Sequence, residues 1–271
     1  MVRYREGRPA DAVALLRRAA AQAPADAEIA NNLGNAYQAL GAYDEAITAY
    51  TQALAARPDF SWASDNLGCA LQRKGRLNEA VASHVRAIQI EPTLAVAYNN
   101  LGHALKDLGR IDEAEQSLRK SISLAQDLEV HSSLLYILNF QSRVTPAQMR
   151  AEAEAFGAAA QRAARPFTHW PNTRDPARRL NVGLVSGDLR DHPVGLFMEG
   201  VVACLDRQQV CLHVYQSGML ESELTERIRR HVPVWRQVVG LDDEALANLV
   251  RADGVDVLID LAGHTGQNRL L

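Results

Sequence analysis

The first half of the chain repeats itself every 34 residues, and this period limits its fold more than any other feature of the sequence. The pair Leu33-Gly34 recurs 34 positions later as Leu67-Gly68 and again as Leu101-Gly102. Further sets of small residues and prolines keep the same step: Gly41, Gly75 and Gly109; Ala46, Ala80 and Ala114; Ala53 and Ala87; Pro24, Pro58 and Pro92. Units of this length stack on their neighbours to bury a continuous core, so the pattern predicts a solenoid of repeats.

One unit, residues 27–60, indicates why each repeat should consist of two helices. Gly41 ends the first helix, because a left-handed conformation costs a glycine little. Asp44 then lies at the start of the second helix, where negative charge suits the helix dipole, and Pro58 stops it. Period and pattern are those of the tetratricopeptide repeat. Residues 7–24 fit only the second helix of a unit, so we expect the sequence to begin partway along a longer array.

An asparagine precedes the Leu-Gly pair in all three full repeats, at Asn32, Asn66 and Asn100. Asparagine is only a middling helix former, so helix propensity does not explain its choice. The position is offset from the packing face toward the concave side of the stack, where a row of amides can hold an extended peptide by its backbone. Alternatively, each asparagine bonds a neighbouring helix and tightens the stack. The sequence leaves both interpretations open.

The repeat pattern decays after residue 121, and a joint follows. Two helices are expected there, one over residues 127–141 and an alanine-rich one over residues 145–165 that begins with a Thr-Pro cap. Residues 166–179 contain three prolines and no apolar period, which is typical of an ordered linker on the surface. We expect Phe167 and Trp170 to anchor this linker to a neighbouring element.

The rest of the chain alternates short apolar runs with helical segments, and this pattern predicts a Rossmann-like α/β lobe with a parallel sheet. The expected strands are residues 180–185, 210–215, 235–239 and 255–261. The expected helices are residues 194–205, 221–232 and 242–252. Four strands are few for such a sheet, so we expect the lobe to be incomplete. The sequence therefore divides into a repeat array, a joint and a first lobe, at residues 1–128, 129–179 and 180–271.

Two loops at the carboxyl ends of predicted strands contain the polar residues of this lobe. Ligands of open parallel sheets bind in the crevice beyond those ends, so the two loops form the candidate site. The first loop contains Asp188, His192 and Pro193, and the second contains Gly263, His264, Thr265, Asn268 and Arg269. No Gly-x-Gly-x-x-Gly turn, phosphate-binding Walker loop, Ser-His-Asp pattern or Cys-His pattern occurs, which argues against a nucleotide-binding oxidoreductase.

The remaining histidines and the cysteines give no sign of a metal site in the sequence. His84, His103, His131 and His231 lie on predicted helices without ligand spacing, so we interpret them as surface or packing residues. The cysteines, Cys69, Cys204 and Cys211, are odd in number and lie in apolar contexts. We interpret them as small buried residues rather than disulfide partners or metal ligands.

Composition argues against several kinds of partner. A net charge of -3 and a pI near 6.2 indicate no general attraction to nucleic acid or anionic membranes. The apolar runs fall short of the roughly 18–20 residues that a membrane helix needs, and the first residues lack the apolar core of a signal peptide. We therefore expect a reducing, cytoplasmic location and no nucleic-acid or membrane partner.

A tetratricopeptide array that leads into GLVSGDLRDHPVG and ends in IDLAGHTGQNRL resembles the nucleocytoplasmic O-linked N-acetylglucosamine transferases and their SPINDLY relatives, in the bacterial-type branch. The resemblance covers nearly the whole chain, and the two loop motifs in this order make it specific. It implies a catalytic region of two Rossmann-like lobes with the sugar nucleotide between them, of which the second lobe is absent from this sequence. The lysine of that lobe, which meets the diphosphate leaving group, therefore has no counterpart here.

The family's functional residues can be placed on matching positions of this sequence. The resemblance implies that His192, in the His-Pro motif, faces the donor sugar as the catalytic residue, and that Thr265 approaches the nucleotide sugar. His264 occurs in a Gly-His-Thr motif that SPINDLY-type members share. Their loop neighbours Asp188, Pro193, Gly263, Asn268 and Arg269 are expected to bind the donor. The three asparagines Asn32, Asn66 and Asn100, called the asparagine ladder below, match residues that hold the acceptor peptide in the family.

The resemblance implies an inverting protein O-glycosyltransferase that moves N-acetylglucosamine from UDP-GlcNAc to Ser or Thr hydroxyls while the repeats bind the acceptor protein. No metal and no cofactor besides the nucleotide sugar is expected. His192 would orient the donor or relay the acceptor proton. Two alternatives stay open: SPINDLY-type transfer of fucose from GDP-fucose, and a truncated, non-catalytic scaffold. Because the second lobe is absent, we expect residues 1–271 alone to be inactive.

Overall fold

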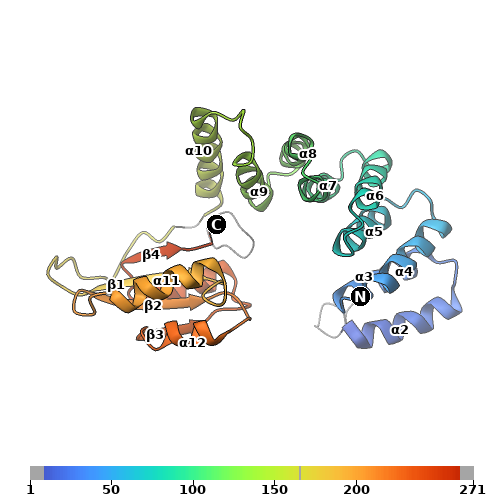
Figure 1. Cartoon of the computed structure of the whole chain (residues 1–271). Coiled ribbons are helices and arrows are strands. Elements are labelled where there is room, and N and C mark those ends of the chain that lie inside the picture. The colour runs from blue at the N-terminus through green and yellow to red at the C-terminus, as the bar shows by residue number, and fades with distance from the viewer. Residues whose placement is uncertain (1–8, 165, 263–271) are drawn as a thin grey trace. The chain divides into compact units, whose positions relative to one another are not determined.

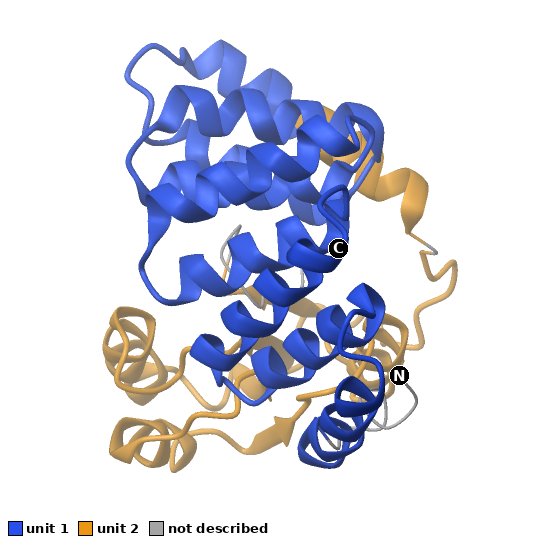
Figure 2. Ribbon diagram, turned by 90° about the vertical axis from the view of Figure 1, so that its right-hand side faces the viewer, with its two compact units in different colours: residues 1–153 blue, residues 154–271 orange. Residues whose placement is uncertain are grey.

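The computed structural model describes residues 9–164 and 166–262, and the chain forms two compact units, residues 1–153 and 154–271 (Figure 2). The boundary between the units lies within the last helix of the joint. The helices of the repeats and the joint are α2 (Pro9–Gln22), α3 (Ala27–Ala39), α4 (Tyr43–Ala56), α5 (Ser61–Arg73), α6 (Leu77–Ile90), α7 (Ala95–Asp107), α8 (Ile111–Leu124), α9 (Leu128–Leu138) and α10 (Pro146–Ala163). Within the described residues, no helix is long and apolar enough to cross a membrane.

The predicted solenoid of helix pairs is confirmed. Helices α3, α5 and α7 lie on the inner side of the arc that unit 1 forms, and α4, α6 and α8 lie on its outer side (Figure 1). Gly41, Gly75 and Gly109 have φ angles of 73°, 74° and 75°, so each repeat turns between its helices through a left-handed glycine, as the 34-residue register predicts.

Small residues let the two helices of each pair approach closely. Ala46, Ala80 and Ala114 are fully buried. A Cβ atom on Gly68 would lie 2.5 Å from Cε1 of His84, and the equivalent glycines of the neighbouring repeats are similarly confined. The recurrent glycine and alanine positions are therefore fixed by helix packing as well as by turn geometry.

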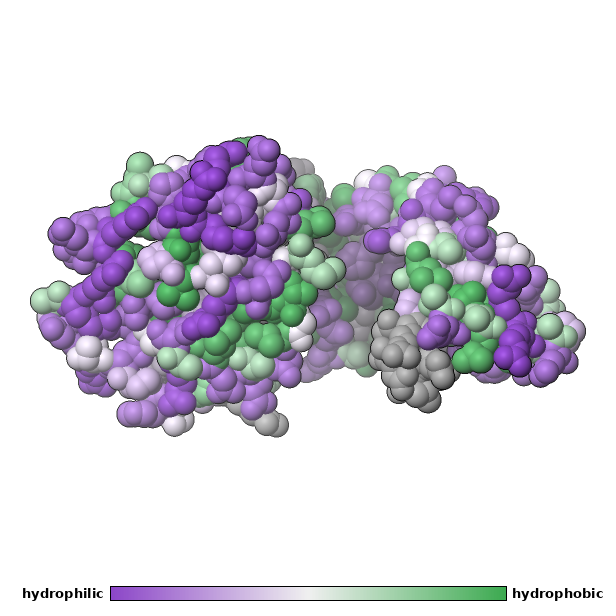
Figure 3. Space-filling view, turned by 90° about the horizontal axis from the view of Figure 1, so that it is seen from below, coloured by the Kyte–Doolittle hydropathy of each residue, from purple (hydrophilic) through white to green (hydrophobic). Residues whose placement is uncertain are grey.

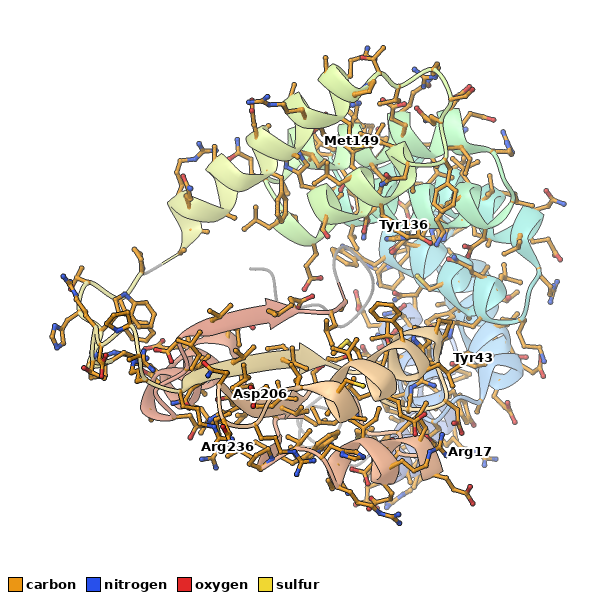
Figure 4. All side chains as sticks on the ribbon, turned by 60° about the vertical axis from the view of Figure 1, so that its left-hand side comes forward. Arg17, Tyr43, Tyr136, Met149, Asp206 and Arg236 are labelled. Carbon is orange, nitrogen blue, oxygen red and sulfur yellow. The ribbon has the colours of Figure 1, made fainter. Side chains whose placement is uncertain are left out.

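The joint helices begin where their caps predict. The Asp127 side chain accepts from the backbone N–H of Glu129 at 2.8 Å, and α9 starts at the next residue after the cap. Thr145 Oγ1 accepts from Gln148 N at 3.3 Å, while Gln148 Oε1 accepts from Thr145 N at 2.9 Å, which forms a reciprocal cap for α10. Met149 of α10, labelled in Figure 4, packs on the apolar cluster shared by α8 and α9.

Unit 2 contains a four-stranded parallel sheet of order β3-β2-β1-β4, so the predicted parallel lobe is also confirmed. Its strands are β1 (Leu180–Ser186), β2 (Val210–Gln216), β3 (Val234–Gln237) and β4 (Val257–Asp260). Its helices after the linker are α11 (Pro193–Cys204), α12 (Glu223–Arg229) and α13 (Asp243–Ala252). Each element lies within a few residues of the range expected from the sequence.

Helices cover both faces of the sheet. One core joins Leu184 of β1 to Met198 of α11 and Ile228 of α12. The other core joins Val185, the next residue of β1, to Val250 of α13. Successive side chains of a strand point to opposite faces, so this alternation shows that β1 is covered by helices on both faces. The edge strand β4 is less covered, since Val257, Leu258 and Ile259 are 45%, 50% and 41% exposed. Apolar side chains also occur on the molecular surface among hydrophilic ones (Figure 3).

The linker is held to the sheet of unit 2 mainly by polar contacts to the carboxylate of Asp256. Arg178 forms an ion pair with Asp256 through the two terminal nitrogens of its guanidinium group, Nη1 and Nη2. Asn181 N donates to the same carboxylate at 2.9 Å. Phe167 lies under the Arg251 guanidinium, 4.8 Å from ring centroid to Cζ, as an aromatic anchor. Trp170, the other expected anchor, is 55% exposed, and its ring packs edge-on against that of Phe167 within the linker itself.

Replacing Asp256 by asparagine is expected to destabilise unit 2, because Arg178 would lose its ionic partner. The Arg178 guanidinium holds the pKa of Asp256 far below its ordinary value. A carboxyl with a depressed folded-state pKa stabilises the fold above its unfolded pKa, about 3.9, and this contribution is lost as the pH falls below that value. We expect the wild type to unfold about 5 °C or more above Asp256→Asn at pH 7, and the gap to close toward pH 2.

Thermal unfolding followed by circular dichroism at several pH values measures this gap. Glu244→Gln, which neutralises an exposed carboxylate on α13, is the matched control and should leave the midpoint nearly unchanged. A gap that stays constant between pH 7 and pH 2 would show that the Asp256 charge does not stabilise the linker.

Candidate functional site

The carboxyl ends of the four strands bring the polar residues of unit 2 to one edge of the sheet. The strands are parallel, and their last residues are Ser186, Gln216, Gln237 and Asp260. Val185 pairs with Asp260 in the β1–β4 register, so the loop after β1 and the chain leaving β4 start side by side. This edge is where ligands of open α/β sheets bind, as expected from the two polar loops of the sequence.

His192 lies at the amino end of α11, directly after the loop that follows β1. Its backbone is extended, with φ -149° and ψ 151°, and its Nδ1 atom accepts from Val194 N at 3.3 Å. His192 is therefore the N-cap of the helix, and Pro193 occupies the first helical turn, where its missing N–H costs nothing. In a neutral ring whose Nδ1 accepts, the hydrogen is on Nε2. The half-buried ring thus presents an N–H donor with its other nitrogen.

Close backbone contacts fix the loop before His192. A Cβ atom on Gly195 would lie 2.2 Å from the carbonyl oxygen of Arg190, and one on Gly218 would lie 2.4 Å from that of Gly187. The first contact holds the loop against α11, and the second holds it against the segment after β2. These contacts require glycine, so the loop has one narrow path across the edge of the sheet.

Side chains tie the same loop to its surroundings. Asp188 forms an ion pair with Arg190 at 3.1 Å, and its backbone N–H donates to Ser186 Oγ at 3.0 Å. Asp191 N donates to Ser222 Oγ at 3.0 Å, and Ser222 also caps α12. The carboxylate of Asp188 thus already has a cationic partner, and the charge of Arg190 is compensated by this ion pair.

Helix α11 is joined to α12 by an ion pair next to the site. Arg227 Nε donates to Glu199 Oε1 at 2.6 Å, and this bond holds the pKa of the Glu199 carboxyl below its ordinary value. The same helix also leaves two large apolar side chains uncovered: Leu196 is 62% exposed and Phe197 is 74% exposed. Cys204, at the end of the same helix, is exposed as well, so the expectation that all three cysteines are buried is wrong.

Sequence reasoning missed a polar pair at the end of β2. Gln216 is fully buried, and neither atom of its amide has a hydrogen-bond partner among the described residues. The Ser217 hydroxyl beside it is also buried without a partner there. The sequence signal that could have found this pair is a polar residue, Gln216, at the carboxyl end of a largely apolar strand, where ligands of such sheets bind. Gln237, which closes β3, donates to the Gly218 carbonyl at 2.9 Å and belongs to the same polar row.

Of the predicted donor-binding residues, the structure brings Asp188, His192 and Pro193 together on one loop and one helix end. The remaining ones follow β4 and lie outside the described residues: Gly263, His264, Thr265, Asn268 and Arg269.

The asparagine ladder lies on the inner helices and bonds from one repeat to the next. Asn66 Nδ2 donates to Asn31 Oδ1 at 3.0 Å, and Asn100 Nδ2 donates to Asp65 Oδ2 at 2.9 Å. Asn32, Asn66 and Asn100 are all half-buried. The interpretation that these amides tighten the stack is therefore correct for Asn66 and Asn100. Whether they also hold a peptide stays a prediction.

Known families match both parts of this arrangement. Tetratricopeptide repeat families match residues 3–64, 70–109 and 95–128. Glycosyl transferase family 41 matches residues 114–270, which covers the joint and the lobe. The fold and the edge of the sheet thus define a tetratricopeptide-repeat protein with a glycosyltransferase lobe. Because the family 41 match covers more than half of the chain, the chain belongs to glycosyl transferase family 41.

Individual relatives agree with this assignment. The chain is 34% identical over 108 residues to the "Probable UDP-N-acetylglucosamine--peptide N-acetylglucosaminyltransferase SPINDLY" of Petunia hybrida, which is 38% of this chain and 12% of that protein. It is 30% identical over 105 residues to the similarly named SEC of Arabidopsis thaliana, covering 37% of this chain and 11% of that one.

Solved structures extend the similarity beyond the repeats. The K341M mutant of the Thermobaculum terrenum O-GlcNAc transferase superposes with a TM-score of 0.71 at 32% identity, over 90% of this chain and 47% of that one. MamA of Desulfovibrio magneticus, with a TM-score of 0.52 at 23% identity, shows the repeat fold alone. The matched part is thus just under half of the bacterial transferase and 12% of the SPINDLY protein.

Proposed function

We propose that this chain supplies the acceptor-binding repeats and the first catalytic lobe of a protein O-glycosyltransferase that uses UDP-GlcNAc and modifies Ser or Thr hydroxyls. The observation that carries the proposal is the family 41 match over residues 114–270, since it covers the loop and helix that place His192 at the edge of the sheet. The names of the relatives, probable UDP-N-acetylglucosamine--peptide N-acetylglucosaminyltransferases, support the choice of donor. On this proposal, residues 1–271 alone bind the donor weakly and are inactive.

His192 is proposed to act as a hydrogen-bond donor to the nucleotide sugar. Its Nδ1 atom is engaged by Val194 N, so a proton-accepting role at that nitrogen would require the cap of α11 to break. Its Nε2–H remains to orient the donor and to meet charge that develops on the leaving diphosphate. The amino end of α11 adds positive potential at the same edge. Of the two roles expected for His192 from the sequence, to orient the donor or to relay the acceptor proton, this proposal corresponds to the first.

Transfer is tested on the gene product that contains residues 1–271, incubated with a library of Ser- and Thr-containing peptides and either UDP-GlcNAc or GDP-fucose. Fragmentation mass spectrometry identifies the added sugar and its residue. We expect an N-acetylhexosamine on Ser or Thr with UDP-GlcNAc. A deoxyhexose with GDP-fucose alone would establish the SPINDLY-type alternative, and no transfer from either donor would favour a scaffold.

The acceptor is proposed to bind along the inner helices through the asparagine amides. Replacing both Asn66 and Asn100 by alanine should weaken the binding of an acceptor peptide about tenfold, because each lost hydrogen bond contributes about 0.5–1.5 kcal/mol. Fluorescence anisotropy with a labelled peptide identified in the transfer assay measures this loss. Gln52→Ala, on an exposed site of α4, is the control. Unchanged peptide affinity in the double variant would limit the ladder to its role in stacking.

A further inference from the structure

The second repeat differs from its neighbours at three positions that meet in its core. They are Asp65 and Cys69 of α5 and His84 of α6. The preceding repeat has Asn31, Asn35 and Tyr50 at these positions, and the following repeat has Asn99, His103 and Leu118. The three residue types that commonly bind transition metals thus occur together in one repeat, although the repeat fold does not require them.

The helix pair brings these side chains into one cluster. Asp65 and Cys69 are four residues apart, so they lie on one face of α5. One potential ligand atom from each of Asp65, Cys69 and His84 lies within 4.8 Å of the other two. His84 is fully buried and Asp65 is 2% exposed, while Cys69 is half-buried and leaves a route to the cluster. The His84 ring fits because Gly68 has no side chain.

The hydrogen bonds of the cluster leave the imidazole incompletely satisfied. His84 Nδ1 lies 2.6 Å from Asp65 Oδ1, and Asn100 donates to the other carboxylate oxygen at 2.9 Å. His84 Nε2 is buried and has no hydrogen-bond partner among the described residues. Leaving a buried polar atom unpaired costs free energy, so such an atom in a core calls for a ligand.

We propose that Asp65, Cys69 and His84 form a structural zinc site that joins α5 to α6. Carboxylate oxygen, thiolate sulfur and imidazole nitrogen bind Zn²⁺ with bonds of about 2.0–2.3 Å, and a water molecule would complete the tetrahedral shell. The three donor atoms lie within 4.8 Å of one another and must rearrange locally to reach these bond lengths. Two anionic ligands balance the charge of the ion, which matters in a buried site. The inference goes beyond the proposed function, because a metal at this cluster would hold α5 to α6 whether or not the repeats bind an acceptor.

Binding at this site must displace a proton. Burial and the nearby Asp65 charge raise the pKa of the Cys69 thiol to about 12, so the metal-free cysteine is protonated. When Zn²⁺ binds, an S–Zn bond forms and the thiol proton leaves to solvent. No metal was expected from the sequence, because the three donors lie on two helices and show no ligand spacing along the chain.

Cobalt titration of chelator-treated wild-type protein tests the proposal directly, because Co²⁺ bound to a thiolate absorbs in the near ultraviolet. We expect one equivalent of Co²⁺ per chain with this band, loss of the band when Zn²⁺ is added, and a rise of several degrees in the unfolding midpoint with Zn²⁺. Absence of the band from folded wild-type protein at saturating Co²⁺ would overturn the proposal.

Variants that copy the neighbouring repeats identify the ligands with the least disturbance of the fold. Cys69→Asn introduces the residue found at Asn35 and should abolish the band, and Asp65→Asn introduces that found at Asn31 and should lower Co²⁺ affinity at least tenfold. The double variant Cys204→Ser/Cys211→Ser is the matched control and should keep the band. A band that survives Cys69→Asn, or that is lost in the control, would contradict the assignment, as would unchanged affinity in Asp65→Asn.

Discussion

Replacing His192 by alanine is expected to lower the turnover of the gene product by about 10²–10³-fold, the range typical for the loss of one positioned hydrogen-bond donor to developing charge. The structure gives this side chain two roles that the alanine variant removes together. Its Nδ1 atom caps α11 through Val194 N, and its Nε2 atom presents a donor at the edge of the sheet where the nucleotide sugar is proposed to lie.

His192→Asn separates the two roles. Asparagine is among the best N-cap residues, so it keeps the start of α11 while removing the Nε2–H group. We expect its turnover to fall as far as that of His192→Ala, with an unfolding midpoint close to that of the wild type. Initial rates of UDP release measure turnover. If the asparagine variant stays within a few-fold of the wild type, His192 acts on activity only by capping the helix.

Gly195→Ala is expected to have the second large effect, because no methyl group fits at this position. Its Cβ atom would lie 2.2 Å from the Arg190 carbonyl oxygen and 3.1 Å from that of Asp188, and these backbone atoms cannot move without displacing the loop. Overpacking of this kind costs about 1–3 kcal/mol. The displaced loop carries His192, so turnover should fall at least tenfold along with stability.

Gly200→Ala on the same helix is the matched control. A Cβ atom there meets nothing within 4 Å, and alanine favours a helix over glycine by about 1 kcal/mol. We expect Gly200→Ala to raise the unfolding midpoint and to leave turnover unchanged. Chemical denaturation and initial rates on both variants give the comparison. Equal stability of the two variants would show that the loop adapts to a methyl group and does not depend on Gly195.

Much of the fold could be predicted because its signals are local or periodic. Strand β1 was expected at residues 180–185 and extends over Leu180–Ser186, since an apolar run between polar segments marks a buried strand. Helix α11 was expected to start one residue later than it does. Pro193 is the reason, because proline at the first helical position was counted with the loop. Helix α12 is shorter than expected and starts at the Ser222 cap.

The contacts between repeats could not be predicted in the same way. Asn66 reaches Asn31, and Asn100 reaches Asp65, over 35 residues of sequence. These bonds depend on the angle between successive inner helices, which a one-dimensional pattern does not contain. The His84–Asp65 pair depends on how α5 packs against α6 within one repeat, which the pattern does not contain either. The exposure of Phe197 on an apolar helix was also not predicted, because only the packed sheet determines which face of α11 is covered.

Hydrogen exchange of the loop after β1 tests most directly whether this edge of the sheet holds the donor. The gene product is exchanged with and without UDP-GlcNAc, and peptides spanning residues 187–195 are compared with peptides from α4 and α6 of the repeats. The proposed site predicts that the donor slows exchange in residues 187–195 and leaves the repeat peptides unchanged. If exchange in residues 187–195 stays unaltered at saturating UDP-GlcNAc, the assignment of His192 and its loop to the sugar-nucleotide site is contradicted.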